Sequence, residues 1–251
     1  MIFKDQIKQQ NGVFIATEPD HQFADIYIKV RNKERRIYSN EELLSLPNII
    51  NYNPHFDEWK LRQKSAKRFV AYLINKRPDS QVLEIGCGNG WFTNICATHS
   101  NFSIGIDVNL PELEQAAQVF KEGNLAFAYW NVFSENPFAS TFNIIVVNAV
   151  IQYFPDTNEL IKKLQQYLSP GGEIHIIDSP FYNLQDIENA KKRSRTYYKS
   201  LGVPVMADHY FHHNKTVISD FEVLYKPTNN KLKRLIKGKD MPFGWYRKIY
   251  K

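Results

Sequence analysis

Three glycines that alternate directly after a short apolar run constrain this chain more than any other feature. The run and its turn read Val82-Leu83-Glu84-Ile85-Gly86-Cys87-Gly88-Asn89-Gly90. A second apolar run, 102–108, carries Asp107 near its end. Glycine lets a backbone turn sharply and approach a ligand closely, and an acid at the end of the next strand can accept hydrogen bonds from ribose hydroxyls. The pattern therefore predicts a nucleoside cofactor across the carboxyl ends of these strands.

The spacing of the glycines selects among nucleoside cofactors. A pyrophosphate site uses G-x-G-x-x-G, so that a helix N-terminus meets the phosphates. Here the spacing is G-x-G-x-G, at Gly86, Gly88 and Gly90, followed by Trp91. Glu84 at the approach to the turn would repel a pyrophosphate, whereas it would attract a cationic amine or sulfonium. The turn therefore favours a cofactor with a cationic group.

The glycine stretch resembles the first motif of the class I, Rossmann-like S-adenosylmethionine-dependent methyltransferases. Later segments follow the order of that family: Trp130-Asn131-Val132, the strand and loop at 142–154, Leu168-Ser169-Pro170-Gly171-Gly172-Glu173 and the strand ending at Asp178. Asn131 stands where an aspartate is commoner in the family, and its amide oxygen can still accept a hydrogen bond from adenine. Several ordered features are far more specific than a lone glycine motif.

The resemblance implies S-adenosylmethionine as cofactor, with S-adenosylhomocysteine as product. The cofactor-binding residues that it implies are Glu84, Gly86, Cys87, Gly88, Gly90, Asp107, Val108, Asn131, Val132, Asn148 and Ala149. The glycine turn would face the methionine part, Asp107 the ribose and Asn131 the adenine edge. Asn148 and Ala149 would end the fourth strand beside the sulfonium.

Short apolar runs alternate with helical segments through the middle of the chain, and this alternation predicts the fold class. Strands are expected at 81–85, 102–107, 125–130, 143–148 and 173–178. Such alternation is typical of an α/β fold with a doubly wound parallel sheet. The resemblance implies two further strands, 221–225 and 245–250, which give a mostly parallel seven-stranded sheet with an antiparallel last strand in three α/β/α layers.

The first 55 residues are expected to be an N-terminal extension packed on the core, since they are too few for a robust core of their own. They contain β-like pieces at 12–16 and 26–30. Ser39 followed by Glu42 three residues later is the pattern of a helix capping box.

Residues 56–251 are expected to form the Rossmann-like domain. Within it, the aromatic and basic stretch at about 179–215 is interpreted as a lid-like insertion. In this family, residues before the first core helix often close over the cofactor. Trp59 or Arg62 could do so here, with Arg62 facing the methionine carboxylate; the alternative is that Trp59 packs in the core and Arg62 is solvated.

Composition bounds the partners and the compartment. The net charge of +6 is concentrated in 226–251, where nine Lys and Arg accompany one acid, Asp240. This segment is either a site for an anionic partner or a solvated basic loop. Two cysteines, Cys87 and Cys96, are too few for a zinc cluster or a disulfide framework, so both are expected to pack in a reducing compartment. No apolar run is long enough to span a bilayer and the start lacks a signal peptide, which predicts a cytoplasmic protein.

Methyl transfer from a sulfonium mainly requires the nucleophile to be held in line with the methyl group. A general base helps when the acceptor is a hydroxyl or a protonated amine. The catalytic candidates are His209 and Tyr153; further candidates near the substrate are Gln152, Asp178, Tyr182, His212 and His213. The compact histidine cluster could bind a metal, but no metal is predicted.

The leading hypothesis is a methyltransferase acting on an O or N atom of a small-molecule acceptor. One alternative is an RNA methyltransferase in which 226–251 binds phosphates. The fourth strand ends in Asn148-Ala149-Val150-Ile151 rather than the Asn/Asp-Pro-Pro-aromatic motif of adenine-directed enzymes, and no cysteine is placed to attack a pyrimidine. Another alternative is a non-catalytic cofactor-binding subunit. The acceptor, the base and the oligomeric state stay open at this stage.

Overall fold

One twisted sheet organises residues 2–4, 7–50, 52–228 and 239–251, which are the residues that this computed structural model describes. Its strand order is β1-β2-β5-β4-β3-β6-β7-β9-β8. The parallel strands are β3 (Gln81–Ile85), β4 (Phe102–Asp107), β5 (Leu125–Tyr129), β6 (Phe142–Asn148) and β7 (Leu168–Ile177). The last strand, β9 (Trp245–Ile249), lies antiparallel between β7 and β8 (Glu222–Tyr225).

The mostly parallel α/β sheet with an antiparallel last strand is confirmed, but the predicted number of seven strands is wrong. Nine strands are present in the described residues, because the N-terminal segment adds a hairpin, β1 (Lys8–Gln10) and β2 (Val13–Ile15), at the edge beyond β5. Strand β2 runs parallel to β5, with Val13 opposite Phe127. The β-like piece at 12–16 was visible in the sequence, but its partner lies more than one hundred residues away.

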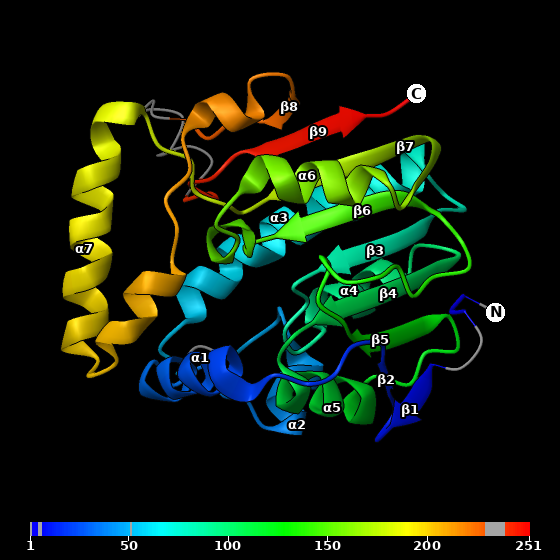
Figure 1. The fold of residues 1–251 in the computed structure, drawn as a ribbon, viewed down its shortest axis with the longest axis horizontal. Helices are drawn as coiled ribbons and strands as arrows, with labels where there is room; N and C mark the ends of the chain where they lie inside the picture. The colour runs from blue at the N-terminus through cyan, green and yellow to red at the C-terminus, as the bar shows by residue number, and fades with distance from the viewer. Residues whose placement is uncertain (1, 5–6, 51, 229–238) are drawn as a thin grey trace.

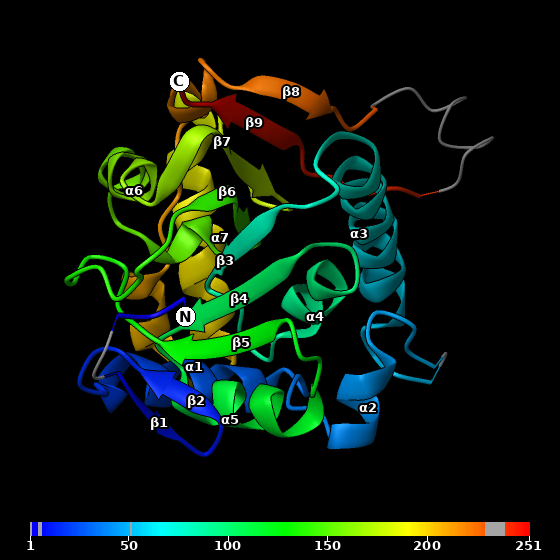
Figure 2. The ribbon, with the colours of Figure 1, turned by 90° about the vertical axis from the view of Figure 1, so that its right-hand side faces the viewer.

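Helices cover both faces of the sheet. One face carries α3 (Phe56–Lys76), α4 (Trp91–Ala97) and α5 (Leu110–Val119), and the other carries α6 (Thr157–Gln165). Figure 2 shows α3 and α4 on one side of the strands and α6 on the opposite side. The parallel strands are therefore buried on both faces, as expected for a doubly wound sheet.

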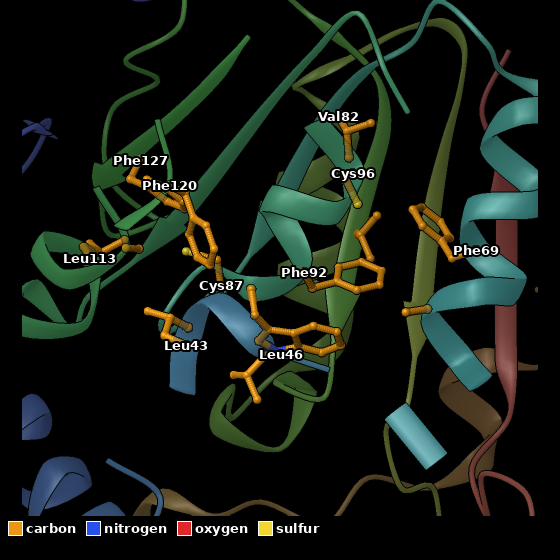
Figure 3. Packing of buried hydrophobic residues seen from close by; sticks show 14 of the residues in the cluster. Leu43, Leu46, Phe69, Val82, Cys87, Phe92, Cys96, Leu113, Phe120 and Phe127 are labelled. Carbon is orange, nitrogen blue, oxygen red and sulfur yellow. The ribbon is translucent and has the colours of Figure 1, made fainter. Parts of the chain in front are cut away.

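The core under α3 and α4 contains both cysteines. Figure 3 shows Phe92 of α4 between its own helix and Phe69 of α3, and the two ring centroids are 5.4 Å apart. Cys87 and Cys96 are free and buried in this cluster. Burial raises the pKa of both thiols well above the usual range, so they are packing residues.

The N-terminal segment is more helical than the sequence indicated. The β-like reading of 26–30 is wrong, since these residues belong to α1 (His21–Lys33), which Asp20 caps by accepting the N–H of Gln22 at 2.9 Å. The apolar residues Phe23, Ile26, Tyr27 and Val30 follow helical spacing and pack in a cluster with Tyr198 and Met206. The predicted capping box of Ser39 and Glu42 starts α2 (Asn40–Ser45).

The carboxyl ends of the parallel strands are covered by two helices that are far apart in sequence. Figure 1 shows α1 and α7 (Ile187–Ser200) beyond the ends at which β3 and β6 finish. Short 3-10 helices connect the rest: η1 (Ile151–Tyr153), η2 (Leu184–Asp186), η3 (Pro204–His209) and η4 (Lys215–Ile218). Among the described helices, none has the length and apolar character that crossing a membrane requires.

Candidate functional site

Two adjoining cavities lie between the strand ends and the covering helices. The first cavity has a volume of about 760 Å³ and the second about 390 Å³. Gly86, Ala149, Tyr27 and Tyr153 line both of them. Volumes in this range and a position at the carboxyl ends of parallel strands are typical of cofactor sites.

The glycine turn forms the boundary between the cavities, and it requires glycine for two reasons. Gly86 and Gly90 have φ values of +66° and +74°, which side chains rarely adopt. A Cβ on Gly86 would lie 2.2 Å from Cγ2 of Val150, and one on Gly90 would lie 2.5 Å from the ring of Phe127. Gly88 has a φ of +53° and lines the second cavity with Cys87. The backbone is therefore free to contact a ligand closely.

Asp107 ends β4 and lines the first cavity. Its carboxylate accepts the N–H groups of Gly88 at 2.7 Å, Val108 at 2.7 Å and Asn109 at 2.9 Å. Burial raises the pKa of this carboxyl, while these hydrogen bonds lower it. A carboxylate has roughly four acceptor positions, so it can still accept from a hydroxyl group in the cavity while it holds the glycine turn in place.

The far end of the first cavity is formed by Val108, Asn131 and Val132. The side-chain oxygen of Asn131 accepts the N–H of Phe133 at 3.1 Å. Its backbone N–H donates to the hydroxyl of Thr17 at 3.1 Å, which ties this loop to the N-terminal segment. The predicted adenine-side residues therefore lie together in one cavity with Asp107.

Glu84 is a buried acid without a cation beside it. Glu84 is 2% exposed, and the hydroxyl of Thr93 donates a hydrogen bond to its carboxyl group at 2.5 Å. Among the described residues, no basic group lies within 4.0 Å of its carboxyl. Burial raises its pKa to about 8, so the carboxyl is mostly protonated at neutral pH. It faces the second cavity.

Unpaired acceptors surround Glu84 in the second cavity. Asn148 and Gln152 are each 8% exposed, and the side-chain oxygen of each is buried with no hydrogen-bond partner in the described part of the chain. The nitrogen of Gln152 donates to the backbone oxygen of Ala149 at 2.7 Å, which fixes the amide orientation. Ala149 itself has a φ of +54°, a strained value for a non-glycine residue. A cationic N–H donor would satisfy these acceptors.

The second cavity also holds arginines. Nε of Arg31 is buried without a hydrogen-bond partner in the described structure, and its nearest carboxylate, Glu112, is 4.0 Å away. Arg62, the residue that the sequence proposed for the methionine carboxylate, shares Glu58 with Arg36. Arg31 is therefore the less satisfied cation. Its place in the cavity is not evident from the sequence, because the run 26–30 before it also suits a strand, whereas the structure has a helix there.

Trp59 packs in the core, which is the alternative to a residue that closes over the cofactor, and its side chain also reaches the wall of the second cavity. It is 3% exposed and donates to the hydroxyl of Tyr38 at 2.8 Å. It also lines the second cavity beside Trp91, whose ring centroid is 5.1 Å away. The side chain thus packs in the core and forms part of the cavity wall.

The two catalytic candidates occupy different positions. His209 lines the first cavity, with its ring 5.5 Å from that of Phe23. Tyr153 lies at the junction of the cavities, edge-on to Tyr27 at 5.7 Å and to Tyr210 at 5.8 Å. Burial raises the pKa of Tyr153, so its hydroxyl is protonated at neutral pH.

Gln152 lines the second cavity, but the other four candidates line neither cavity: Asp178, Tyr182, His212 and His213. Asp178 accepts from the hydroxyl of Ser65 at 2.7 Å, and burial raises its pKa to about 6. His212 bonds the hydroxyl of Ser194 at 2.9 Å, and His213 bonds the backbone oxygen of Ile151 at 3.1 Å. Tyr182 packs against His212. No group of three or more potential metal ligands occurs among the described residues.

The basic C-terminal segment is described only in part. Residues 229–238, with Lys231, Lys233, Arg234 and Lys237, lie outside the described residues. Of the remainder, Arg247 pairs with Glu222 and Lys248 pairs with Asp220. These two cations therefore have partners within the protein.

Comparison with known proteins places the sequence near methyltransferases. The sequence pattern of the methyltransferase-domain family matches residues 59–220. Malonyl-[acyl-carrier protein] O-methyltransferase of Halalkalibacterium halodurans is 31% identical over 140 residues, which cover 50% of this chain and 52% of that protein. Trans-aconitate 2-methyltransferase of Deinococcus radiodurans is 28% identical over 131 residues, covering 51% and 49%. The chain thus matches about half the length of these curated relatives.

Solved structures share the fold at low sequence identity. Magnesium protoporphyrin IX methyltransferase ChlM from Synechocystis PCC 6803, with bound S-adenosylhomocysteine, aligns with a TM-score of 0.56 and 15% identity over 91% of this chain and 97% of that chain. N-methyltransferase NodS from Bradyrhizobium japonicum WM9, also with S-adenosylhomocysteine, aligns with a TM-score of 0.53 and 18% identity over 88% and 97%.

Proposed function

The chain belongs to the methyltransferase-domain family, and we propose that it transfers a methyl group from S-adenosylmethionine to an oxygen or nitrogen atom of a small-molecule acceptor. The observation that carries this proposal is the pair of adjoining cavities that meet at the glycine turn. Each cavity has the polar groups that suit one end of this cofactor.

The first cavity suits the adenosine part. Asp107 has an acceptor position for a ribose hydroxyl, and Val108 and Val132 offer apolar contacts for the adenine ring. Asn131 lies at the predicted adenine edge of the cavity, where its oxygen already accepts from Phe133 and its side-chain nitrogen has no hydrogen-bond partner among the described residues, so this nitrogen can donate to the ligand. We assign these residues to adenosine binding.

The second cavity suits the amino-acid part of the cofactor. An ammonium group would satisfy the unpaired oxygens of Asn148 and Gln152 and would favour the ionised form of Glu84. A carboxylate would satisfy the unpaired Nε of Arg31. We therefore assign Arg31, rather than Arg62, to the methionine carboxylate, with Gly86, Cys87, Gly88 and Gly90 forming the turn against the chain of the cofactor.

The chemistry follows from position. When bound, S-adenosylmethionine supplies an activated methyl group on a sulfonium with a neutral leaving group. The residues that line both cavities would border this sulfonium and exclude water from it: Tyr27, Gly86, Ala149 and Tyr153. The second cavity extends past them toward α7 and would hold the acceptor in line. His209 stays a candidate for a general base if the acceptor carries a proton, whereas Tyr153, whose hydroxyl is protonated at neutral pH, would act only as a hydrogen-bond donor.

The N-terminal segment and the stretch 179–215 would together close the site. Thr17, Asp20 and Phe23 line the first cavity, while Arg193 and Tyr197 of α7 line the second. Helix α1 packs on η3 through the cluster of Val30, Tyr198 and Met206. We infer that 1–55 is an extension of the domain 56–251 and that 179–215 acts as its lid.

The direct test is calorimetric titration of S-adenosylmethionine and S-adenosylhomocysteine into the protein and into Asp107→Ala. We expect micromolar binding that falls at least about 100-fold in the variant, because both a ribose contact and the anchor of the glycine turn are lost. Asp79→Ala, which removes an exposed aspartate, is the matched control. Absence of binding by both compounds to the unmodified protein would contradict the proposal.

A further inference from the structure

A serine and a histidine connect the second cavity with a third one. Ser194 of α7 lines the second cavity, and its Oγ lies 2.9 Å from Nε2 of His212. His212 lines a third cavity of about 330 Å³, whose wall also includes Asp208 and His213. Tyr210 lines both cavities, so they adjoin. The hydrogen bond between Ser194 and His212 therefore crosses the wall between them.

This hydrogen bond has a preferred direction. The hydroxyl of Ser194 forms no other hydrogen bond with the described residues, so its proton is satisfied only when Nε2 of His212 accepts it. A neutral imidazole has one protonated nitrogen, which places the ring proton of His212 on Nδ1. The hydroxyl oxygen of Ser194 then keeps its lone pairs for a donor inside the second cavity.

His212 differs from a histidine with a purely structural role, for which His175 is the example in this protein. Both ring nitrogens of His175 are bonded, since Trp245 donates to Nδ1 at 3.0 Å and Nε2 lies 3.0 Å from the carboxylate of Glu173. Nδ1 of His212, in contrast, is buried and has no hydrogen-bond partner among the described residues. A buried polar atom without a partner is unusual in a folded protein and is often kept for a functional reason.

The surroundings of His212 keep its ring neutral and able to accept a proton at neutral pH. Burial and then Lys191 lower the pKa of His212 below the usual value of 6.5, and Glu188 opposes them. The charged and titratable neighbours come from α7, from the next residue in the chain and from two facing rings: Glu188, Lys191, Arg193, His213, Tyr182 and Tyr210. The pKa of each tyrosine is raised, so neither ring carries a charge at neutral pH.

The other acid–base groups that line the second cavity lie against the cofactor in the assignment made above. Glu84 faces the ammonium group, and Glu112 lies 4.0 Å from Arg31, which is assigned to the carboxylate. Tyr153 keeps its proton at neutral pH, because burial raises its pKa. Ser194 belongs to α7, which lies on the side of the cavity assigned to the acceptor. It is therefore the polar group best placed to receive a proton from the acceptor.

From this arrangement we propose that Ser194 and His212 form a proton relay, which removes the proton of a hydroxyl or amine acceptor from the second cavity. The inference rests on the proposed methyltransferase function and identifies the group that receives the proton. The other candidate, His209, lines only the first cavity, on the adenosine side of the site. The relay reaches the acceptor side without any histidine in the wall of the second cavity.

The step balances within the site. The oxygen or nitrogen of the acceptor forms a bond to the methyl carbon, the carbon–sulfur bond breaks, and its electron pair goes to sulfur. The proton of the acceptor passes to Oγ of Ser194 while the hydroxyl proton passes to Nε2 of His212. The products are the methylated acceptor, a neutral thioether and an imidazolium, so the positive charge moves from sulfur to His212. Ser194 touches the acceptor, and His212 acts through it.

The first test measures the position of the ring proton and needs no acceptor. The protein is prepared with histidine that is isotopically labelled at both ring nitrogens, and its nitrogen resonances are recorded at neutral pH with S-adenosylhomocysteine bound. His212→Gln assigns the signals of His212 by their loss. We expect a neutral ring with its proton on Nδ1, and Ser194→Ala should shift the Nε2 resonance. A proton on Nε2, or a charged ring at neutral pH, would overturn the relay.

The second test measures methyl transfer from saturating tritium-labelled S-adenosylmethionine to two phenols. The pH is chosen so that phenol keeps its proton whereas 4-nitrophenol has lost it. Ser194→Ala and His212→Gln should each lower kcat for phenol about 100-fold, and the double variant should be no slower, because the two residues act as a unit. The rate with 4-nitrophenol and the affinity for S-adenosylhomocysteine should stay within about twofold. Ser200→Ala and His99→Gln, at residues outside the described linings of both cavities, are the matched controls.

Two further readouts separate proton transfer from a structural role of the pair. In the unmodified protein, kcat for phenol should fall as the pH drops below about 6.5, because an imidazolium cannot accept a proton, and His212→Gln should lack this fall. Added imidazole should restore part of the rate of His212→Ala, since the lost ring leaves space at the third cavity.

Equal losses with phenol and 4-nitrophenol, or similar losses in the control variants, would overturn the relay. If neither phenol is methylated, the tautomer of His212 alone decides. The affinity for S-adenosylhomocysteine separates the two levels of the argument. If that compound binds and the ring proton lies on Nε2, the relay is wrong while the cofactor site stands. If it does not bind, the proposed function itself fails.

Discussion

Two buried glutamates in the same sheet have opposite environments. Glu84 on β3 and Glu173 on β7 are 2% and 1% exposed. Around Glu173, Arg77 donates at 2.7 Å, the hydroxyl of Tyr72 at 2.6 Å, and His175 lies at 3.0 Å. Burial would raise the pKa of Glu173, but these hydrogen bonds outweigh it and lower the pKa to about 2.

Glu84 has none of these cations, and burial raises its pKa to about 8. The pKa of Glu84, about 8, thus lies far above that of Glu173, about 2, although both side chains are almost fully buried. A buried acid whose charge is satisfied by the protein stabilises the fold, whereas one without a cation has a place for a cationic ligand. The comparison distinguishes a structural ion network from a binding site without reference to any relative.

The largest expected effect is on stability. Glu173→Gln should lower the free energy of unfolding by about 3 kcal/mol, because Arg77 loses its buried ionic partner and His175 loses an acceptor. Glu84→Gln should change it by less than about 1 kcal/mol, since an amide replaces a carboxyl that is already neutral. Urea denaturation at neutral pH measures both.

The stabilisation by Glu173 should depend on pH, because it requires the ionised carboxylate. The folded pKa of Glu173 lies below its ordinary value, so its contribution is complete above about pH 4.5 and is lost as the pH falls toward 2. The difference between the unmodified protein and Glu173→Gln should shrink over that interval. Equal stability of the two glutamine variants would show that the comparison is wrong.

The second effect is on the affinity for S-adenosylhomocysteine. Here Glu84→Gln should be the variant with the larger loss, whereas Glu173→Gln has the larger loss of stability. Glu84→Gln should weaken S-adenosylhomocysteine binding by about 10- to 100-fold, the loss of one charge-assisted hydrogen bond to an ammonium. Glu173→Gln should stay within twofold when it is measured well below its unfolding temperature, because Glu173 lines neither cavity. Isothermal titration at constant pH decides between them, and similar losses in both variants would contradict a ligand role for Glu84.

How much of this was predictable depends on whether the determinant is local. The turn at Gly86 and the acid at Asp107 follow from adjacent residues and backbone sterics, so the sequence predicted where they lie. Helix α1 was missed because Ile26-Tyr27-Ile28-Lys29-Val30 also suits a strand. Its helical form depends on packing against Met206 and Tyr198, far along the chain.

The same reason explains what was missed in the site. Arg31 enters the second cavity only because α1 is a helix, so its role was not visible in the sequence. The paired state of Glu173 depends on Arg77 and Tyr72, which α3 and its end bring from about one hundred residues away. A sequence alone shows that both acids interrupt apolar runs, but it does not show which of them has cations nearby.

The smallest expected effect is the release of about one proton when the ligand binds. At pH 7 the carboxyl of Glu84 is mostly protonated in the free protein, because its pKa is about 8. An ammonium beside it would lower that pKa, so binding S-adenosylhomocysteine should release a proton, and affinity should rise with pH by up to about tenfold per unit below pH 8.

Glu112, with a pKa of about 7, faces the opposite change if a carboxylate binds Arg31, since the guanidinium would then stabilise its charge less. The informative quantity is therefore the difference between the unmodified protein and Glu84→Gln, in which Glu112 is unchanged. Calorimetry at pH 7 in buffers of different ionisation enthalpy counts the protons, and the difference should approach one proton per ligand. A difference near zero would mean that Glu84 does not ionise on binding, and that the ammonium is held by the oxygens of Asn148 and Gln152 alone.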